Sequence, residues 1–130
     1  KKYLSKIIAN DNEGLQMISA CCAGAEIKIS DIKYLQENKV FLLSLKRSKV
    51  ETENGDKKVV SVCKFEFVDQ VKSKNIKQND PEQKLELIGM DYLKNNDNYE
   101  INLIFTNNAH ITLSTEIIEV TLDDLNKITQ

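Results

Sequence analysis

The stretch "KVFLLSLKRSKVETENGDKKVVSVCKFEFVDQV" (39–71) decides the fold of this chain. Residues that favour strands, mainly Val, Leu and Phe, occupy its two ends, over 39–50 and 59–71, and a polar segment separates them. That polar segment is centred on Asn54-Gly55, a dipeptide favoured in hairpin turns. The stretch therefore predicts two long strands that pair in antiparallel fashion.

Further strand patterns lie within and on both sides of this hairpin. In its second strand, Phe65 and Phe67 are two residues apart and are expected on one face of the sheet. Before it, the segment 27–35 alternates apolar and polar residues, with a slip in phase at Ser30-Asp31 that indicates a bulge or a corner. The remaining strands are expected over 3–8, 84–93, 99–105 and 109–120, and the longest loop over 72–83.

A first helix is expected over about 11–23. Asn10 or Asp11 can accept hydrogen bonds from the free amide groups of its first turn. Apolar residues then recur at spacings of three and four, as on one helix face: Leu15, Ile18 and Cys22. Gly24 lies where a left-handed residue would end the helix.

A second, short helix is expected over about 121–128. Thr121 can cap it, and Asp123 and Asp124 would lie at its positive end, where carboxylates are stabilised. Leu122 and Leu125 would face the core.

These elements define an α+β fold. About seven strands joined by short turns form one bent antiparallel sheet, or a split barrel, with a helix at each end. A pleckstrin-homology-like barrel is the alternative, although that fold does not usually place a helix as early as 11–23. At 130 residues the chain has the size of one domain, which we expect to span 1–130.

Composition excludes several classes of protein. The chain is 41% hydrophobic and 29% charged, which is typical of a globular rather than a disordered protein. No apolar run approaches the roughly 18 residues of a membrane helix, and residues 1–10 hold too few apolar side chains for a signal peptide. The three cysteines are an odd number, which argues against a disulfide framework. We therefore expect a cytoplasmic protein with no membrane contact.

The reactive side chains are interpreted as structural. Cys21 and Cys22 follow apolar residues of the first helix and Cys63 lies on a strand, without the CxxC or HxxxH spacing of a zinc site. His110 is expected to point to solvent just after a turn, and no nucleophile motif accompanies it. We therefore expect no catalytic residue, no metal site and no cofactor.

Charge is distributed unevenly along the chain. Residues 39–77 hold ten basic and five acidic side chains, a net charge of +5, whereas residues 78–130 hold three basic and ten acidic ones, a net charge of −7. A basic segment of this kind is either a solvated face or a surface for phosphate groups or an acidic partner. The candidate basic binding surface consists of Lys46, Arg47, Lys49, Lys57, Lys58, Lys72 and Lys74.

A family resemblance is carried by three segments, "LSKIIANDNEGLQMISACCAGAEIKISDIKYL" (4–35), "FLLSL" (41–45) and "IIEVTLDDL" (117–125). They are similar to sequences of a small alphaproteobacterial family catalogued as a domain of unknown function, and the similarity extends over nearly the whole chain. The resemblance implies a cytoplasmic bacterial protein and supplies no activity.

The chain departs from that family at two places. It has "ACCAGA" (20–25) where relatives tend to have a His-containing "AHLQDA", and "KRSK" (46–49) where they tend to have an Arg-Phe-x-Trp segment. If either segment were an active site of the family, this chain would have lost it.

Three functions follow as hypotheses. The first is a non-catalytic interaction module that binds another protein, with the basic central segment as its surface. The second is a nucleic-acid or phosphate-binding protein that uses the same basic residues. The third is a small-ligand carrier or an enzyme, which predicts a concave apolar pocket near His110 or the cysteines. The sequence leaves the partner and the oligomeric state open.

Overall fold

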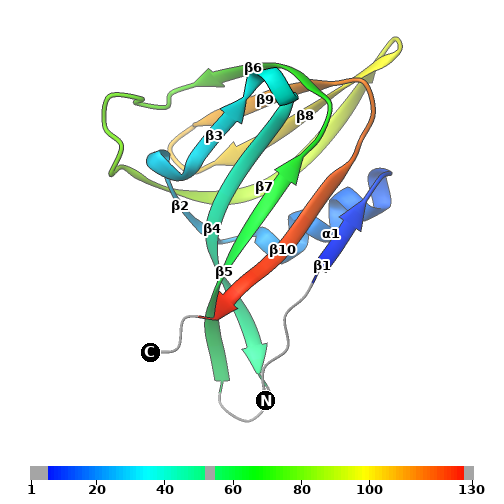
Figure 1. Ribbon diagram of the computed structural model, residues 1–130. Coiled ribbons are helices and arrows are strands. Elements are labelled where there is room, and N and C mark those ends of the chain that lie inside the picture. Colours follow the sequence, from blue (N-terminus) through cyan, green and yellow to red (C-terminus); the bar gives the residue numbers. More distant parts are fainter. Residues whose placement is uncertain (1–5, 52–54, 128–130) are drawn as a thin grey trace.

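A computed structural model describes residues 6–51 and 55–127, with side chains over 6–48 and 58–125. Within these residues the chain forms ten strands, one α-helix and two short 3₁₀ turns (Figure 1). Their bounds are β1 Lys6–Ala9, α1 Asn12–Cys22, β2 Glu26–Lys28, η1 Ile29–Asp31, β3 Ile32–Leu35, η2 Gln36–Asn38, β4 Val40–Glu51, β5 Gly55–Phe65, β6 Val68–Lys74, β7 Lys84–Asn95, β8 Asn98–Phe105, β9 His110–Thr115 and β10 Val120–Lys127.

The ten described strands belong to one open antiparallel sheet. Its strand order is β1-β10-β5-β4-β2-β7-β8-β9-β6, and β3 pairs with β4 beside that path. The sheet curls strongly but its two ends, β1 and β6, do not pair with each other (Figure 1). The α+β class with about seven strands is therefore wrong, and so are the closed alternatives, the split barrel and the pleckstrin-homology-like barrel. The fold is mostly sheet, with one helix in the described part.

The second helix, expected over 121–128, is also wrong. Residues 120–127 form β10, and residue 128 lies outside the described part. Leu122 is buried and Leu125 is 44% exposed, as expected when residues three apart lie on opposite faces of a strand. β10 pairs with β1 on one side and with β5 on the other. This pairing satisfies the hydrogen-bonding groups of the β10 backbone within the sheet. It therefore outweighs the local preference of the segment for helix.

The central hairpin is confirmed in part. β4 and β5 pair from Phe41 opposite Phe65 to Glu51 opposite Gly55, whereas residues 52–54 of the turn lie outside the described part. The strand expected over 59–71 ends at Phe65, because the chain turns at Phe67 with a φ of +60°. The next strand, β6, then pairs with β9 instead.

Two further expectations are wrong: the shared face of Phe65 and Phe67, and the single strand over 109–120. The first is corrected by the turn at Phe67 and the second by a turn at 116–119. Phe65 is fully buried and Phe67 is 40% exposed, so the two rings do not share a face. The strand expected over 109–120 is divided into β9 and β10 by the segment 116–119. The two turns lie side by side, because the Glu66 amide donates to the Glu119 carbonyl at 2.9 Å.

The first helix is confirmed over Asn12–Cys22 as α1. The Asp11 side chain caps it by accepting a hydrogen bond from the Gly14 amide at 2.8 Å. A Cβ atom at Gly14 would lie 2.8 Å from the Cβ of Ala9, so the close approach of α1 to β1 requires glycine there. The buried stripe Leu15, Ile18 and Cys22 packs against the sheet.

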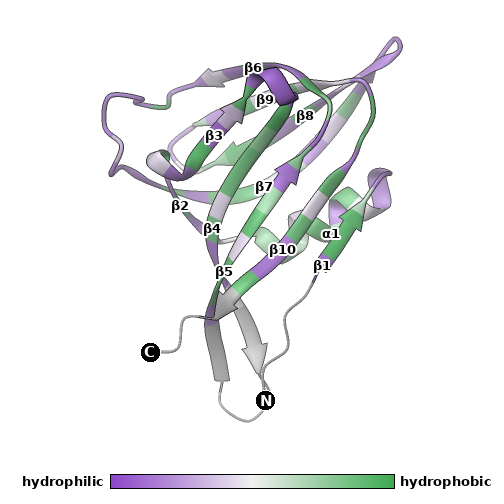
Figure 2. Ribbon diagram, in the orientation of Figure 1, coloured by the Kyte–Doolittle hydropathy of each residue, from purple (hydrophilic) through white to green (hydrophobic). Residues whose placement is uncertain are grey.

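The hydrophobic core lies on one face of the sheet, called the inner face below. Along β4 the buried residues Phe41, Leu43 and Leu45 point to this face, and the residues between them point to the outer face. Figure 2 shows the result: apolar segments run through the body of the sheet, while the loops and the tip of the β7–β8 hairpin are hydrophilic. Any internal binding site must therefore be formed by side chains of the inner face.

Candidate functional site

The predicted basic residues are spread over two parts of the sheet. Lys46 and Lys58 are exposed on β4 and β5. Lys49 and Lys57 are opposite each other in the same hairpin, and their side chains lie outside the described part.

Lys72 and Lys74 are exposed on β6. In the strand order β2, β7, β8 and β9 lie between β4 and β6, and Figure 1 shows β6 at the top and the end of the β4–β5 hairpin at the bottom. Among the predicted residues with described side chains, Lys46 and Lys58 therefore lie apart from Lys72 and Lys74. The nucleic-acid hypothesis loses the single patch of these residues that motivated it.

Arg47 does not belong to the surface at all. Only 6% of the residue is exposed, because it follows Phe41, Leu43 and Leu45 on the inner face of β4. Including Arg47 in the basic binding surface was therefore wrong.

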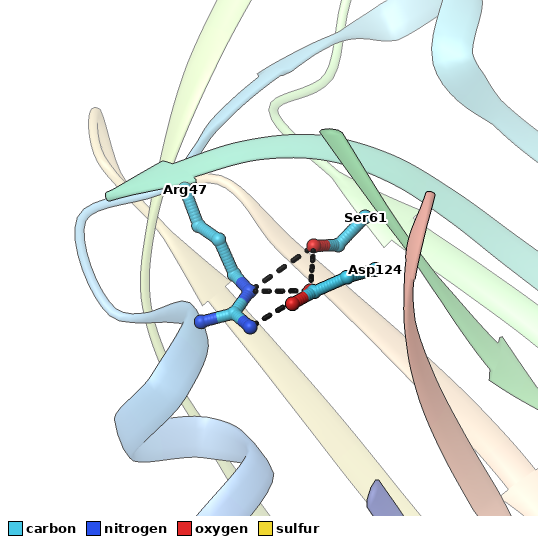
Figure 3. A network of polar contacts seen from close by, with 3 residues as sticks. All are labelled: Arg47, Ser61 and Asp124. Carbon is cyan, nitrogen blue, oxygen red and sulfur yellow. Dashed lines mark hydrogen bonds and ion pairs between the residues drawn. The ribbon is translucent and has the colours of Figure 1, made fainter. Parts of the chain in front are cut away.

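Arg47 belongs instead to a buried polar network with Ser61 of β5 and Asp124 of β10 (Figure 3). Its Nη2 donates to Asp124 Oδ1 at 2.8 Å, and its Nε donates to Ser61 Oγ at 3.1 Å. The Ser61 hydroxyl donates to the same carboxylate oxygen at 2.7 Å. Because each charge is compensated within the network, three polar residues are accommodated in the interior.

The network was missed because sequence reasoning assigned both charges by local context. Arg47 stands in a lysine-rich segment, and Asp124 was explained by the start of a helix. Strand alternation was the signal that could have found the network. Arg47 and Asp124 each lie an even number of residues after a buried apolar residue of the same strand, and therefore on the inner face.

Two of the three thiols lie in the core, as predicted. Cys22 and Cys63 are fully buried, whereas Cys21 is half-buried. Burial raises the pKa of the Cys22 thiol from 9.0 to about 12, and it raises the pKa of Cys63 well above its ordinary value. Both thiols are therefore protonated near neutral pH, a state that is a poor nucleophile and a poor metal ligand.

The raised pKa of Cys22 predicts a loss of stability at alkaline pH. The folded chain keeps the thiol proton up to about pH 12, whereas the unfolded chain releases it above pH 9.0. The stabilising contribution is thus fully present below pH 9 and declines above it, by about 1.4 kcal/mol per pH unit for one thiol. Urea denaturation at pH 8, 9 and 10 measures the slope, and Cys22→Ala should reduce it. Identical slopes for both proteins would contradict the prediction.

His110 points to solvent at the start of β9, as predicted. Its strand partner is Lys74 of β6, so imidazole and ammonium lie on the same outer face. Within the described residues, no group of three or more His, Cys, Asp and Glu side chains could hold a metal ion. The one described α-helix, at 11 residues, is too short and too polar to cross a membrane.

A concave, mainly apolar feature lies between β3 and β6 and is called the β3–β6 slot. It has a volume of about 460 Å³, within the range of about 300 to 1,000 Å³ that ligand pockets occupy. Its walls are mainly apolar, and the residues that form them include Ile29, Ile32, Phe41, Val71, Ile76 and Ile111. Its polar lining includes Ser30, Ser73 and Gln78, and Lys33 is the charged residue of the lining.

Both ends of the slot are held by hydrogen bonds. At one end the Tyr34 hydroxyl donates to the Val68 carbonyl at 2.7 Å, and the Val68 amide donates to the Lys39 carbonyl at 2.8 Å. At the other end the Ser30 amide donates to the Pro81 carbonyl at 3.0 Å. The slot is therefore a fixed opening in the curled sheet. Sequence reasoning missed it, because local patterns do not show which strands become edges.

A family model described as "Protein of unknown function (DUF2948)" matches residues 5–130. No curated protein and no solved structure matches the chain. The family match covers the three segments on which the resemblance was based, apart from residue 4 at the start of the first. On this match, the chain belongs to the DUF2948 family of proteins of unknown function.

Proposed function

We propose that this protein is a non-catalytic interaction module that holds a segment of another protein in the β3–β6 slot. The observation that supports this proposal is the slot itself, an apolar opening in the sheet between two strand edges. Apolar concave sites with few polar groups are the usual form of binding sites. The interaction surface is thus the slot with Lys33, Lys72 and Lys74, rather than the whole basic segment.

The positions of the reactive groups are consistent with binding rather than catalysis. Cys22 and Cys63 are buried and protonated, and the slot lining includes neither of them. His110 lies on the outer face, whereas its neighbour Ile111 points inward and lines the slot. The proposal keeps the cytoplasmic location expected from the sequence, which agrees with three free thiols.

The test introduces a photoreactive benzophenone amino acid in place of Ser73, which lines the slot and is exposed. The control carries it in place of Ser48, which is exposed on β4 outside the slot. After irradiation in source cells, we expect a crosslinked protein from the Ser73 position and not from the Ser48 position. That protein is then purified, and its affinity for Ser73→Trp and Ser48→Trp is measured. The slot variant should bind at least about tenfold more weakly than the wild type.

The control variant should bind as the wild type does. Equal crosslinking from both positions, or an affinity that Ser73→Trp leaves unchanged, would place the interface elsewhere and overturn the proposal. The same holds if neither position yields a crosslink while the folded protein is present in the cells.

A further inference from the structure

The β3–β6 slot separates two strand edges that have no partner strand across it among residues 6–51 and 55–127. β3 pairs with β4 and β6 pairs with β9. Each strand is therefore hydrogen-bonded to a neighbouring strand along one edge, and its other edge faces the slot. In the described part of the chain, no backbone hydrogen bond joins residues 32–35 to residues 69–74. Two fixed edges of this kind present unpaired amide and carbonyl groups, which an extended chain can satisfy as an added strand.

Strand alternation defines which side chains of the inner face would contact such an added strand, called the guest strand below. On the inner face, β3 contributes Ile32 and Tyr34. On β6 the inward residues that line the slot are Val71 and, two residues later, the polar Ser73. Val71 is opposite the buried Leu113 of β9, which fixes its inward direction. The inward side chains of the guest strand would therefore contact mainly apolar groups, and every second residue of that strand should be apolar.

On the outer face the charged side chains beside the slot are lysines, and the other outward residues, Leu35 and Gln70, are uncharged. Lys33 lies between the two inward residues of β3, and Lys72 and Lys74 alternate with the inward positions of β6. The nearby carboxylate of Asp69 is already paired with Lys39 at 3.0 Å. The outward side chains of a guest strand would thus lie between lysines on both sides, which favours acidic residues.

We propose that the slot binds a segment of another protein in which apolar and acidic residues alternate, as an added strand between β3 and β6. This inference rests on the proposed function and specifies its partner. The added strand would join the two edges, and Lys33, Lys72 and Lys74 would select against neutral and basic strands. Lysines on a free edge also oppose pairing with a second copy of the same edge, which explains how the slot stays open to its partner.

The test uses a fluorescein-labelled peptide of about eight residues in which Val and Glu alternate, long enough to follow the whole of β6. Fluorescence anisotropy measures its affinity for the full chain. A second peptide alternates Val and Lys, and a third carries N-methyl groups on alternate residues of the Val–Glu sequence. We expect binding of the first, and at least about tenfold weaker binding of the other two.

Matched variants locate the peptide. Lys33→Glu and Lys72→Glu should each weaken binding of the Val–Glu peptide by about tenfold, because each reverses a charge beside the guest. Lys94→Glu on β7 makes the same change away from the slot and should have no effect. Ser73→Trp should abolish binding by filling the slot, whereas Ser48→Trp should not.

Each other outcome overturns part of the proposal in a recognisable way. Equal binding of the Val–Lys peptide would overturn the acidic partner, and full binding of the N-methylated peptide would overturn strand addition. A decanoate ion or a single-stranded RNA that displaces the peptide and binds more tightly would assign the slot to a small molecule or a nucleic acid. Self-association that Ser73→Trp abolishes would assign it to a second copy. If no peptide binds but the crosslinked protein depends on Ser73, this inference fails and the proposed function stands.

Discussion

Asp124→Ala is expected to lower the free energy of unfolding by about 3 to 5 kcal/mol, because Arg47 would keep its charge in the interior without its partner. The Asp124 side chain has no exposed surface and that of Arg47 is 7% exposed, so water cannot replace the lost carboxylate. Ser61 would lose the oxygen to which its hydroxyl donates. Urea denaturation at neutral pH measures the change.

Two further proteins separate the buried charge from other effects of the substitution. The triple variant Arg47→Met, Ser61→Ala and Asp124→Leu replaces the network with apolar groups, and its stability should lie within about 2 kcal/mol of the wild type or above it. Asp123→Ala changes the neighbouring residue on the opposite face of β10 and should have an effect below about 1 kcal/mol. A triple variant as unstable as Asp124→Ala would show that the network contributes net stability rather than avoiding a penalty.

Elements formed by near neighbours in the sequence could be predicted. α1 has a capping residue at Asp11 and a buried stripe at helical spacing, and both signals lie within the segment that folds. The β7–β8 hairpin likewise carries its turn between two adjacent apolar runs. In such elements local propensity and tertiary structure agree, so the sequence pattern is sufficient.

Elements defined by distant contacts could not be predicted in this way. The segment 120–127 has the acidic start and the Leu122–Leu125 spacing of a helix, but its pairing with β1 and β5 makes it a strand. The β3–β6 slot exists because β6, within the described part of the chain, pairs with β9 alone and is separated from β3 by an open gap. Neither fact has a local signature. The alternation of buried residues along β4 could have indicated that Arg47 is buried, but its lysine-rich neighbours favoured a surface interpretation.

Phe65→Ala is expected to lower the free energy of unfolding by about 3 to 5 kcal/mol, through lost burial and the cavity that remains. Phe65 is fully buried at the end of β5, where it lies opposite Phe41 of β4 and Val120 of β10. The centroids of the Phe41 and Phe65 rings are 6.0 Å apart with the planes tilted by 59°, a favourable aromatic arrangement. Urea denaturation measures the change, and Phe65→Leu should recover most of it.

The matched control is Phe67→Ala, two residues further along the same "FEF" segment. Phe67 is 40% exposed at a turn with positive φ, so its removal should cost less than about 1 kcal/mol. Equal losses for the two variants would mean that both rings share the inner face, as the alternation of the segment alone implies. The turn at Phe67 would then not exist, β5 would continue past Phe65, and β6 would not be free to form one wall of the slot. The difference between these two phenylalanines therefore tests the strand arrangement on which the binding proposal depends.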